Sequence, residues 1–287
     1  MLFDAFRAEV FRILRSRSTV FFSVAFVPLM FAIGGVAFHI FTSAKGGDVA
    51  AQLGLLGGSQ EPVNLVEAFS FAAVNGANGV TQVFMLIIAA TVYAGDYRWE
   101  TWRLISARND RISLILGKVG AVKLLALVTM GLFLLASLVF FVAQALTTGR
   151  PLSFTATDGE LGRTILLALL SFLRIVQYGL IALLTAVATR SLLASLFVPF
   201  ALGFGQSILG SLPVMMLLGL RPDSWTAQLL LPGLAYDTLK NAVSAGADQS
   251  VMDQSAILPA AVSLALWIAL PLAGAIALFI RQDIAKE

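Results

Sequence analysis

The chain has 287 residues, of which 59% are hydrophobic and only 12% are charged, and its formal net charge is +3. Soluble domains carry roughly twice that share of charged residues, so we expect an all-α, polytopic membrane protein. The chain has no cysteine and one histidine, His39. This excludes disulfides, iron–sulfur clusters, cysteine-ligated zinc, thiol nucleophiles and, within one chain, a multi-histidine metal site.

Residues 2–17 predict an amphipathic helix that precedes the first apolar run. Its apolar side chains recur with the helical period and are Phe3, Phe6, Val10, Ile13 and Leu14. Its charged side chains Asp4, Glu9, Arg12 and Arg15 gather on the opposite face. Such a helix lies flat in the headgroup region, with its arginines close to anionic membrane lipid.

Six apolar runs are long enough to cross a bilayer, which takes about 20 helical residues. They lie near residues 20–41, 69–94, 119–146, 164–188, 192–217 and 256–280. We expect the whole chain, residues 1–287, to form a single transmembrane domain.

The distribution of Lys and Arg predicts the orientation of these spans. With both termini in the cytoplasm, thirteen cations fall inside and five outside, and Arg174 is left within the fourth span. This partition follows the positive-inside rule, whereas the opposite orientation violates it. Residues 219–255 then form an extracytoplasmic loop. Its semi-apolar middle, Trp225–Val243, predicts a helix or a re-entrant element.

Two groups of polar residues fall inside predicted spans. In the fourth span, Arg174, Gln177 and Tyr178 share a helix face. Because a guanidinium within the membrane needs a partner or water, Arg174 is either a packing strut or a lining residue of a translocation path or dimer-interface gate. In the second span, a polar stripe holds helices together or lines a path near the outer mouth; it consists of Asn75, Asn78 and Gln82.

Catalytic motifs are absent from the sequence. Gly117–Lys118 is followed by Val119 and lacks the upstream glycine of a Walker A loop, so it cannot bind ATP alone. With one histidine, a Ser-His-Asp relay is improbable, and no intramembrane carboxylate pair is present. We therefore expect no catalytic residue, no metal site, no bound cofactor and no nucleic-acid partner.

A charged segment, Gly95–Lys118, separates the second and third apolar runs. Five cations (Arg98, Arg103, Arg108, Arg111 and Lys118) outnumber three acids (Asp96, Glu100 and Asp110). The order of Asp96, Thr101-x-Arg103, Arg111 and Gly117–Lys118 resembles the cytoplasmic segment after the second span of ABC-2 type permeases. These are the membrane subunits of one class of ABC exporter, with a type V exporter-like fold.

The resemblance implies partners and a location. A permease of this family pairs with a second copy or a homologue, and two ABC ATPase subunits, which bind ATP and Mg²⁺, attach on the cytoplasmic side of the bacterial inner membrane. Carried onto this chain, residues 95–118 form a coupling segment and the N-terminal helix braces it. The implied ATPase-coupling residues are Arg98, Glu100, Arg103, Arg108, Arg111, Arg12 and Arg15.

Several functions stay open. The first is export of a hydrophobic or amphipathic peptide, antibiotic or lipid. The second is an interaction subunit that transmits ATP-driven motion to an extracytoplasmic partner through Trp225–Val243. The third is an ion-coupled carrier in which Arg174 handles charge, although the lack of intramembrane carboxylates counts against it. An intramembrane enzyme comes last. The simplest alternative is that the cations of residues 95–118 only set the orientation of the spans and bind lipid headgroups.

Overall fold

The computed structural model describes residues 2–44, 61–99, 102, 110–245 and 254–282. Its helices are α1 (Leu2–Arg15), α2 (Arg17–Val20), a π turn η1 (Phe21–Ala25), α3 (Phe26–Ala44), α5 (Leu65–Asn75), α6 (Gly79–Arg98), α8 (Arg111–Thr148), α9 (Glu160–Thr189), α10 (Leu192–Leu209), α11 (Leu212–Leu217), α12 (Trp225–Leu230), α13 (Pro232–Ala245), the short 3₁₀ turn η3 (Gln254–Ala256) and α14 (Ile257–Arg281). Two-residue strands β1 (Val63–Asn64) and β2 (Leu152–Ser153) pair in parallel.

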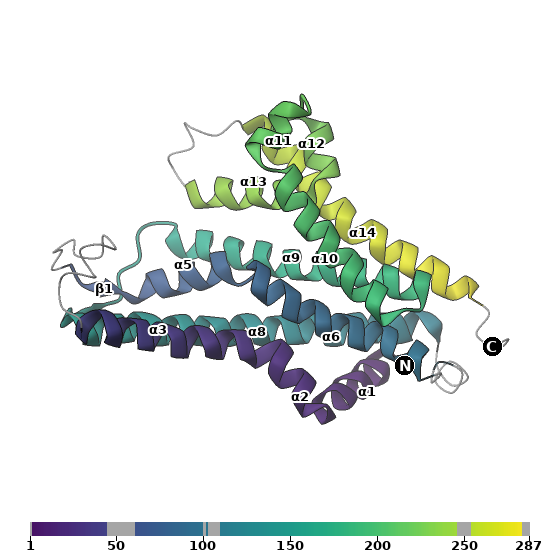
Figure 1. Cartoon of the computed structure of the whole chain (residues 1–287), viewed down its shortest axis with the longest axis horizontal. Helices are drawn as coiled ribbons and strands as arrows, with labels where there is room; N and C mark the ends of the chain where they lie inside the picture. Colours follow the sequence, from purple (N-terminus) through teal and green to yellow (C-terminus); the bar gives the residue numbers. More distant parts are fainter. Residues whose placement is uncertain (1, 45–60, 100–101, 103–109, 246–253, 283–287) are drawn as a thin grey trace.

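Among the described residues, six helical segments are long and apolar enough to cross a membrane, which confirms the predicted all-α class and agrees with the six apolar runs of the sequence. They are Arg17–Ala44, Gly79–Arg98, Arg111–Thr148, Glu160–Thr189, Leu192–Leu209 and Gln254–Arg281. Six such helices fit a multi-pass membrane protein. The start of α1 and the end of α14 lie toward the same end of the bundle, here called the termini end, and β1 lies at the opposite end (Figure 1).

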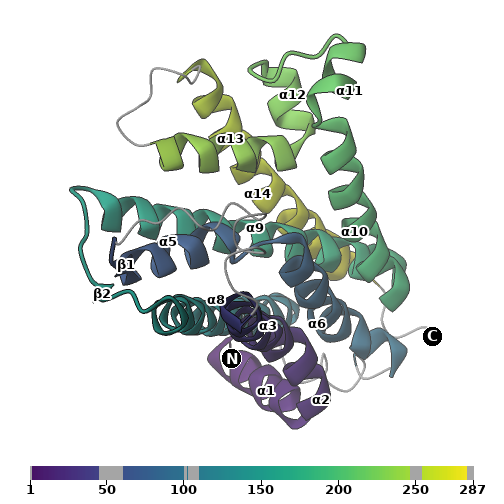
Figure 2. The same ribbon diagram turned by 60° about the vertical axis from the view of Figure 1, so that its left-hand side comes forward.

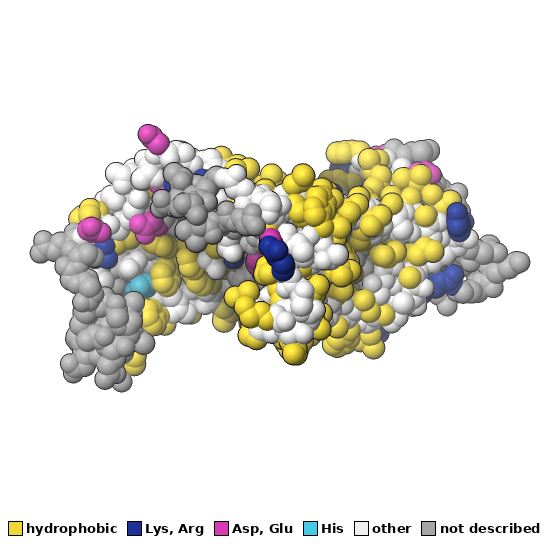
Figure 3. Space-filling view, turned by 90° about the horizontal axis from the view of Figure 1, so that it is seen from above, with side chains coloured by type: hydrophobic (Ala, Val, Ile, Leu, Met, Phe, Trp, Pro, Cys, Tyr) yellow, Lys and Arg dark blue, Asp and Glu magenta, His cyan; other side chains and the backbone are white. Residues whose placement is uncertain are grey.

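The hydrophobic core lies where α6, α8 and α9 meet, with side chains of α1 and α14 added at the termini end. The helices α6 and α9 are the most buried spans, whereas α10 has the smallest share of buried residues. Seen from above, hydrophobic side chains cover much of the surface between the two ends (Figure 3). Such an apolar exterior is what a bilayer-embedded bundle requires.

The second predicted span, residues 69–94, is not one helix. The helix α5 ends at Asn75 and α6 begins at Gly79. The side chain of Asn78 accepts a hydrogen bond from the Thr81 N–H at 2.9 Å, as an N-cap does, and its amide donates to the Asn75 carbonyl at 2.9 Å. These asparagine amides bond backbone groups that the break exposes. The prediction of a continuous helix over residues 69–94 was therefore wrong, since two helices occupy this range.

Two further boundaries differ from the prediction. The third span begins at Arg111 rather than near residue 119, so α8 has 38 residues and is about 57 Å long at 1.5 Å per residue. The fifth span ends at Leu209, because Gly210 and Ser211 interrupt it before α11 starts with a proline in its first turn.

The predicted outer element, Trp225–Val243, consists of two helices, α12 and α13, with Pro232 at the start of the second. Together with α11 they form a group that stands above the long helices and against α14 in both views (Figures 1 and 2). The position of α13 is set by polar contacts with α9 and α10.

Candidate functional site: an ion-pair cluster and an arginine-lined pocket

Four charged side chains from three helices form a cluster at the termini end. The members of this ion-pair cluster are Glu9 and Arg12 of α1, Asp96 of α6 and Lys118 of α8. Lys118 Nζ lies 2.9 Å from Glu9 Oε1 and also donates to the Asp96 carboxylate. Arg12 binds the same two acids, with Nη2 at 2.7 Å from Glu9 Oε2.

Lys118 is the centre of this cluster. Its side chain is 1% exposed, and Nζ donates a further hydrogen bond to the Val92 carbonyl at 3.1 Å. The ammonium group also lies 5.1 Å from the centre of the Trp102 ring, a distance at which a cation is attracted to an aromatic face. A buried ammonium with this many partners is compensated, which is the condition for keeping its charge inside a protein.

Glycines on α8 let α1 approach closely enough for these contacts. A Cβ atom at Gly117 would lie 3.0 Å from backbone atoms of Ala5 and Phe6, and one at Gly120 would lie 3.0 Å from the Phe6 ring. Gly117 and Lys118, adjacent in the sequence, therefore act together. The glycine admits the backbone of α1 and the lysine binds its carboxylate.

The charged segment 95–118 is not a separate unit in the structure. Its first residues close α6 and its last eight, from Arg111, open α8. Asp96 and Lys118 are buried, so they serve packing between helices. Of the predicted ATPase-coupling residues, Glu100, Arg103 and Arg108 lie outside the described residues.

The other predicted coupling residues have different surroundings. Arg12 belongs to the ion-pair cluster, although 42% of its side chain stays exposed. Arg15 and Arg98 are exposed, each stacked over one ring, that of Phe11 at 5.1 Å and that of Trp99 at 5.4 Å.

Arg111 caps the end of α14. Its Nη1 donates to the carbonyls of Phe279, Ile280 and Gln282 at 3.3, 2.9 and 2.8 Å. These groups are among the carbonyls that a helix end leaves without partners. Arg111 therefore holds the last turn of α14 against the start of α8.

Arg174 lies at the middle of α9 and contacts α13. Its Nη1 donates to the Pro232 carbonyl at 3.0 Å, and its guanidinium lies between two tyrosine rings, 4.8 Å from the centre of Tyr178 and 4.9 Å from that of Tyr236. These contacts match the packing strut that the sequence offered as one reading.

Two more polar residues hold α13 in place. Gln206 of α10 accepts hydrogen bonds from the Gly233 N–H at 2.8 Å and from the Tyr178 hydroxyl at 3.4 Å. Ser171 of α9 bonds the hydroxyl of Tyr236 at 3.1 Å. Burial raises the pKa of Tyr236, so its hydroxyl stays neutral. The start of α13 is thus tied to α9 and α10 through backbone and side-chain groups.

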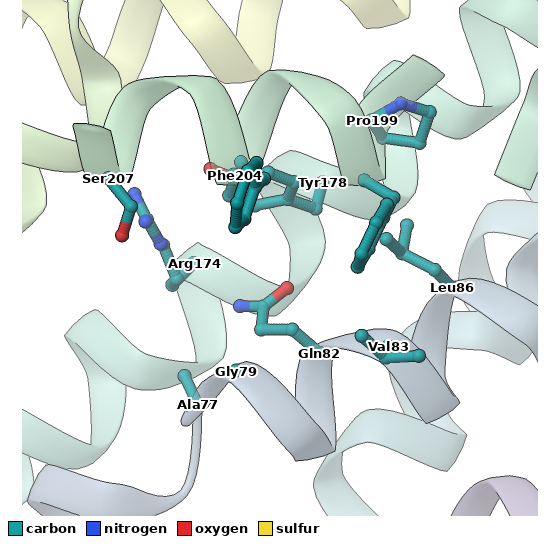
Figure 4. Close-up of a pocket in the computed structure, with 12 residues that line it drawn as sticks. Ala77, Gly79, Gln82, Val83, Leu86, Arg174, Tyr178, Pro199, Phe204 and Ser207 are labelled. Carbon is teal, nitrogen blue, oxygen red and sulfur yellow. The ribbon is translucent and has the colours of Figure 1, made fainter. Parts of the chain in front are cut away.

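A pocket of about 290 Å³ lies between α6, α9 and α10 beside Arg174. Its lining residues are Ala77, Gly79, Gln82, Val83, Leu86, Arg174, Tyr178, Pro199, Phe200, Gly203, Phe204 and Ser207. Figure 4 shows the Gln82 amide reaching from α6 into the space that Arg174 borders, and Ser207 of α10 lines the same pocket. Gly203 is required here, since a Cβ would meet the Tyr178 ring at 3.0 Å.

The six residues predicted for a path or gate fall into three groups. Arg174, Tyr178 and Gln82 line this pocket. Gln177 is fully buried, and neither atom of its amide has a hydrogen-bond partner within the part of the chain that the structure describes. Asn75 and Asn78 lie at the helix break and line a separate, mostly apolar groove of about 480 Å³ beside α3. The predicted polar stripe is therefore divided by the break.

Sequence reasoning missed three residues of the site. Glu9 was placed only on a polar helix face, and Ser171 and Ser207 were given no role at the site. A local signal exists for Glu9 alone, because Glu9 and Arg12 are three residues apart on one helix. Among the described residues, no three Asp, Glu or His side chains are placed to hold a metal ion.

Comparisons with known proteins give no relative. No protein-family model matches the chain, and neither a curated protein nor a solved structure matches it. The geometry described above therefore carries the functional argument.

Proposed function

We propose that this chain is the membrane subunit of an ATP-driven transporter of the ABC-2 type, which exports a hydrophobic or amphipathic molecule. A separate ATPase, in two copies, binds at the termini end, which faces the cytoplasm of a bacterial cell, and a second copy or homologue of the chain completes the complex. The observation that carries the proposal is the ion-pair cluster, which fastens the amphipathic helix α1 to α6 and α8.

A coupling device has to move as one body when a partner pushes on it. Helix α1 packs closely on α8 at Gly117, which faces the α1 backbone, and at Gly120, which faces the Phe6 ring, and the cluster adds buried charge pairs at the same contact. Removing one member of such a pair costs about 3–5 kcal/mol. A force applied to α1 is therefore passed to α6 and α8 rather than absorbed by a loose surface helix.

Helix α6 connects this contact to the pocket. Asp96 in its last turn belongs to the ion-pair cluster, and Gln82 in its first turn lines the pocket. They are fourteen positions apart, which corresponds to about 21 Å of helix. Because the break at residues 76–78 separates α6 from α5, α6 can tilt as a lever whose outer end changes the pocket.

Exposed residues near the cluster supply a docking surface for the ATPase. Arg15 and Arg98 are exposed cations, and Trp99 is 72% exposed. Arginine and tryptophan are the residues most enriched where one protein anchors to another. Arg103 and Arg108 follow Trp99 in the sequence within ten residues.

The test is to co-express the chain with an ABC ATPase encoded beside it, purify the complex and measure ATP hydrolysis. We expect the Arg103→Glu, Arg108→Glu double variant to insert normally but to lose the ATPase or its stimulated hydrolysis. Arg111 is left intact because it caps α14. The matched control is Arg163→Glu, Arg221→Glu, which reverses two cations away from the termini end. If no ATPase co-purifies, or if both double variants behave like wild type, the proposal fails.

A second candidate is an interaction subunit that moves an extracytoplasmic partner. It is favoured by the group α11–α13, on which Met216 and Leu217 are 76% and 85% exposed. In that case Met216→Glu, Leu217→Glu would abolish the cellular function while stimulated ATP hydrolysis continues. Loss of hydrolysis in the same variant would count against it.

A further inference from the structure

The guanidinium of Arg174 keeps unused hydrogen-bond donors. It offers five N–H groups, and one of them binds the Pro232 carbonyl. No carboxylate within the described ranges forms an ion pair with it. Among the described residues the charge therefore has no carboxylate at ion-pair distance, although Asp237 of α13 acts electrostatically on the neighbouring Tyr178 and Tyr236. The charge lies at the middle of a helix long enough to cross a membrane, where a poorly compensated charge is costly.

The unused donors border the pocket between α6, α9 and α10, and other donors meet them there. The Gln82 Nε2 group is buried and has no partner in the described chain. Figure 4 shows it pointing into the space that Arg174 borders, and Ser207 lines the same pocket. No acid is among the residues that line the pocket. A positive charge, an amide N–H₂ and a hydroxyl around one space suit an anion with several acceptor oxygens.

The remaining walls of the pocket are apolar. Val83 and Leu86 line it on α6, and Phe200 and Phe204 line it on α10. Both phenylalanines are also exposed on the outer surface, at 43% and 62%, which in a bilayer is the surface that meets lipid tails. The volume of about 290 Å³ is at the lower end for a small-molecule site, which is enough for a head group and the first carbons of a chain.

We propose that this pocket binds the anionic head group, a carboxylate or a phosphate, of an amphiphile whose apolar chain leaves between Phe200 and Phe204. Arg174 supplies the charge, and Gln82 and Ser207 donate further hydrogen bonds. As the place where a transported substrate sits, the site rests on the proposed function. As a binding site it rests on these side chains alone, so it is tested without any ATPase.

The experiment is a titration of the purified full chain in dodecyl maltoside, followed by native mass spectrometry. The probes are oleate, oleoyl lysophosphatidate, oleoyl lysophosphatidylcholine and inorganic phosphate. We expect oleate and lysophosphatidate to bind at least about tenfold more tightly than lysophosphatidylcholine, because a well-placed charge pair discriminates by this order. Inorganic phosphate should bind far more weakly, since it lacks the apolar chain.

Two variants test the assignment to this pocket. Arg174→Gln should weaken the binding of oleate and lysophosphatidate at least about tenfold and should weaken that of lysophosphatidylcholine, whose phosphate charge is offset by its choline, much less. Because Arg174 also holds α13, Ser207→Phe serves as a second variant that keeps the arginine and fills the pocket; it should lower affinity to the same degree. Ala201→Phe is its matched control, since Ala201 is exposed on the same helix and does not line the pocket.

Three results would overturn the proposal. Equal affinity for lysophosphatidate and lysophosphatidylcholine would show that charge is not recognised. Binding of inorganic phosphate as tight as that of lysophosphatidate would show a site for a free anion instead of an amphiphile. Unchanged affinity in both Arg174→Gln and Ser207→Phe would place binding elsewhere. Binding that behaves as expected in a chain that recruits no ATPase leaves the site standing and removes only the transporter proposal.

Discussion

Lys118 on α8 and Asp96 on α6 form a buried ion pair at the termini end, although 22 residues separate them in the sequence. The side chains are 1% and 3% exposed. Glu9 brings a second carboxylate to the same ammonium from α1. One lysine thus joins three helices, and its substitution should weaken the packing of α1, α6 and α8 against one another.

Loss of Lys118 should therefore destabilise the fold. Lys118→Met removes the buried ammonium that Glu9 and Asp96 share, and breaking a buried pair in this way costs about 3–5 kcal/mol. The measurement is the midpoint of thermal unfolding in detergent, followed by size-exclusion chromatography. Lys123→Met is the matched control. That lysine lies on the same helix, forms no ion pair with any described residue and should change the midpoint little.

The close approach of α1 to α8 predicts opposite effects for two glycines of α8. Gly117→Ala puts a Cβ 3.0 Å from the backbone of Ala5 and Phe6, so α1 has to shift and stability should fall. At Gly131 a Cβ would meet nothing within 4 Å, so Gly131→Ala should be neutral or stabilise by up to about 1 kcal/mol through helix propensity. Hydrogen exchange over residues 2–15 should increase in the first variant only, and equal behaviour of the two variants would contradict this account.

Arg111 should stabilise the end of α14. Arg111→Gln removes a charged donor from three carbonyls. A hydrogen bond to a charged group contributes about 1.5–3 kcal/mol to stability. We expect faster amide exchange and earlier proteolysis at residues 276–282. The control is Arg98→Gln, which changes an exposed cation at the end of α6. It should leave amide exchange and proteolysis at residues 276–282 as in wild type. If Arg111→Gln leaves it unchanged too, the guanidinium does not cap α14.

Two buried glutamines should respond differently to the same change. Gln206→Met leaves the Gly233 N–H without its acceptor and should cost about 1–3 kcal/mol. The amide of Gln177 has no partner in the described chain, so Gln177→Met should be neutral or stabilising, because it removes an unsatisfied polar group. The readout is again thermal unfolding in detergent. A large loss of stability in Gln177→Met would show that its amide has a partner.

The sequence determined the all-α class, the number of helices long and apolar enough to span a membrane and the amphipathic character of α1, because each depends on the length and periodicity of a local stretch. Only the tertiary structure decided that Glu9, Asp96 and Lys118 meet, that Arg111 caps α14 and that Arg174 lies between α13 and a pocket. These contacts join residues 22 to 171 positions apart, and helix packing brings them together. The break at residues 76–78 escaped prediction for a related reason. Asparagine side chains can hold helices together or cap a helix end, and the course of the backbone alone selects between the two.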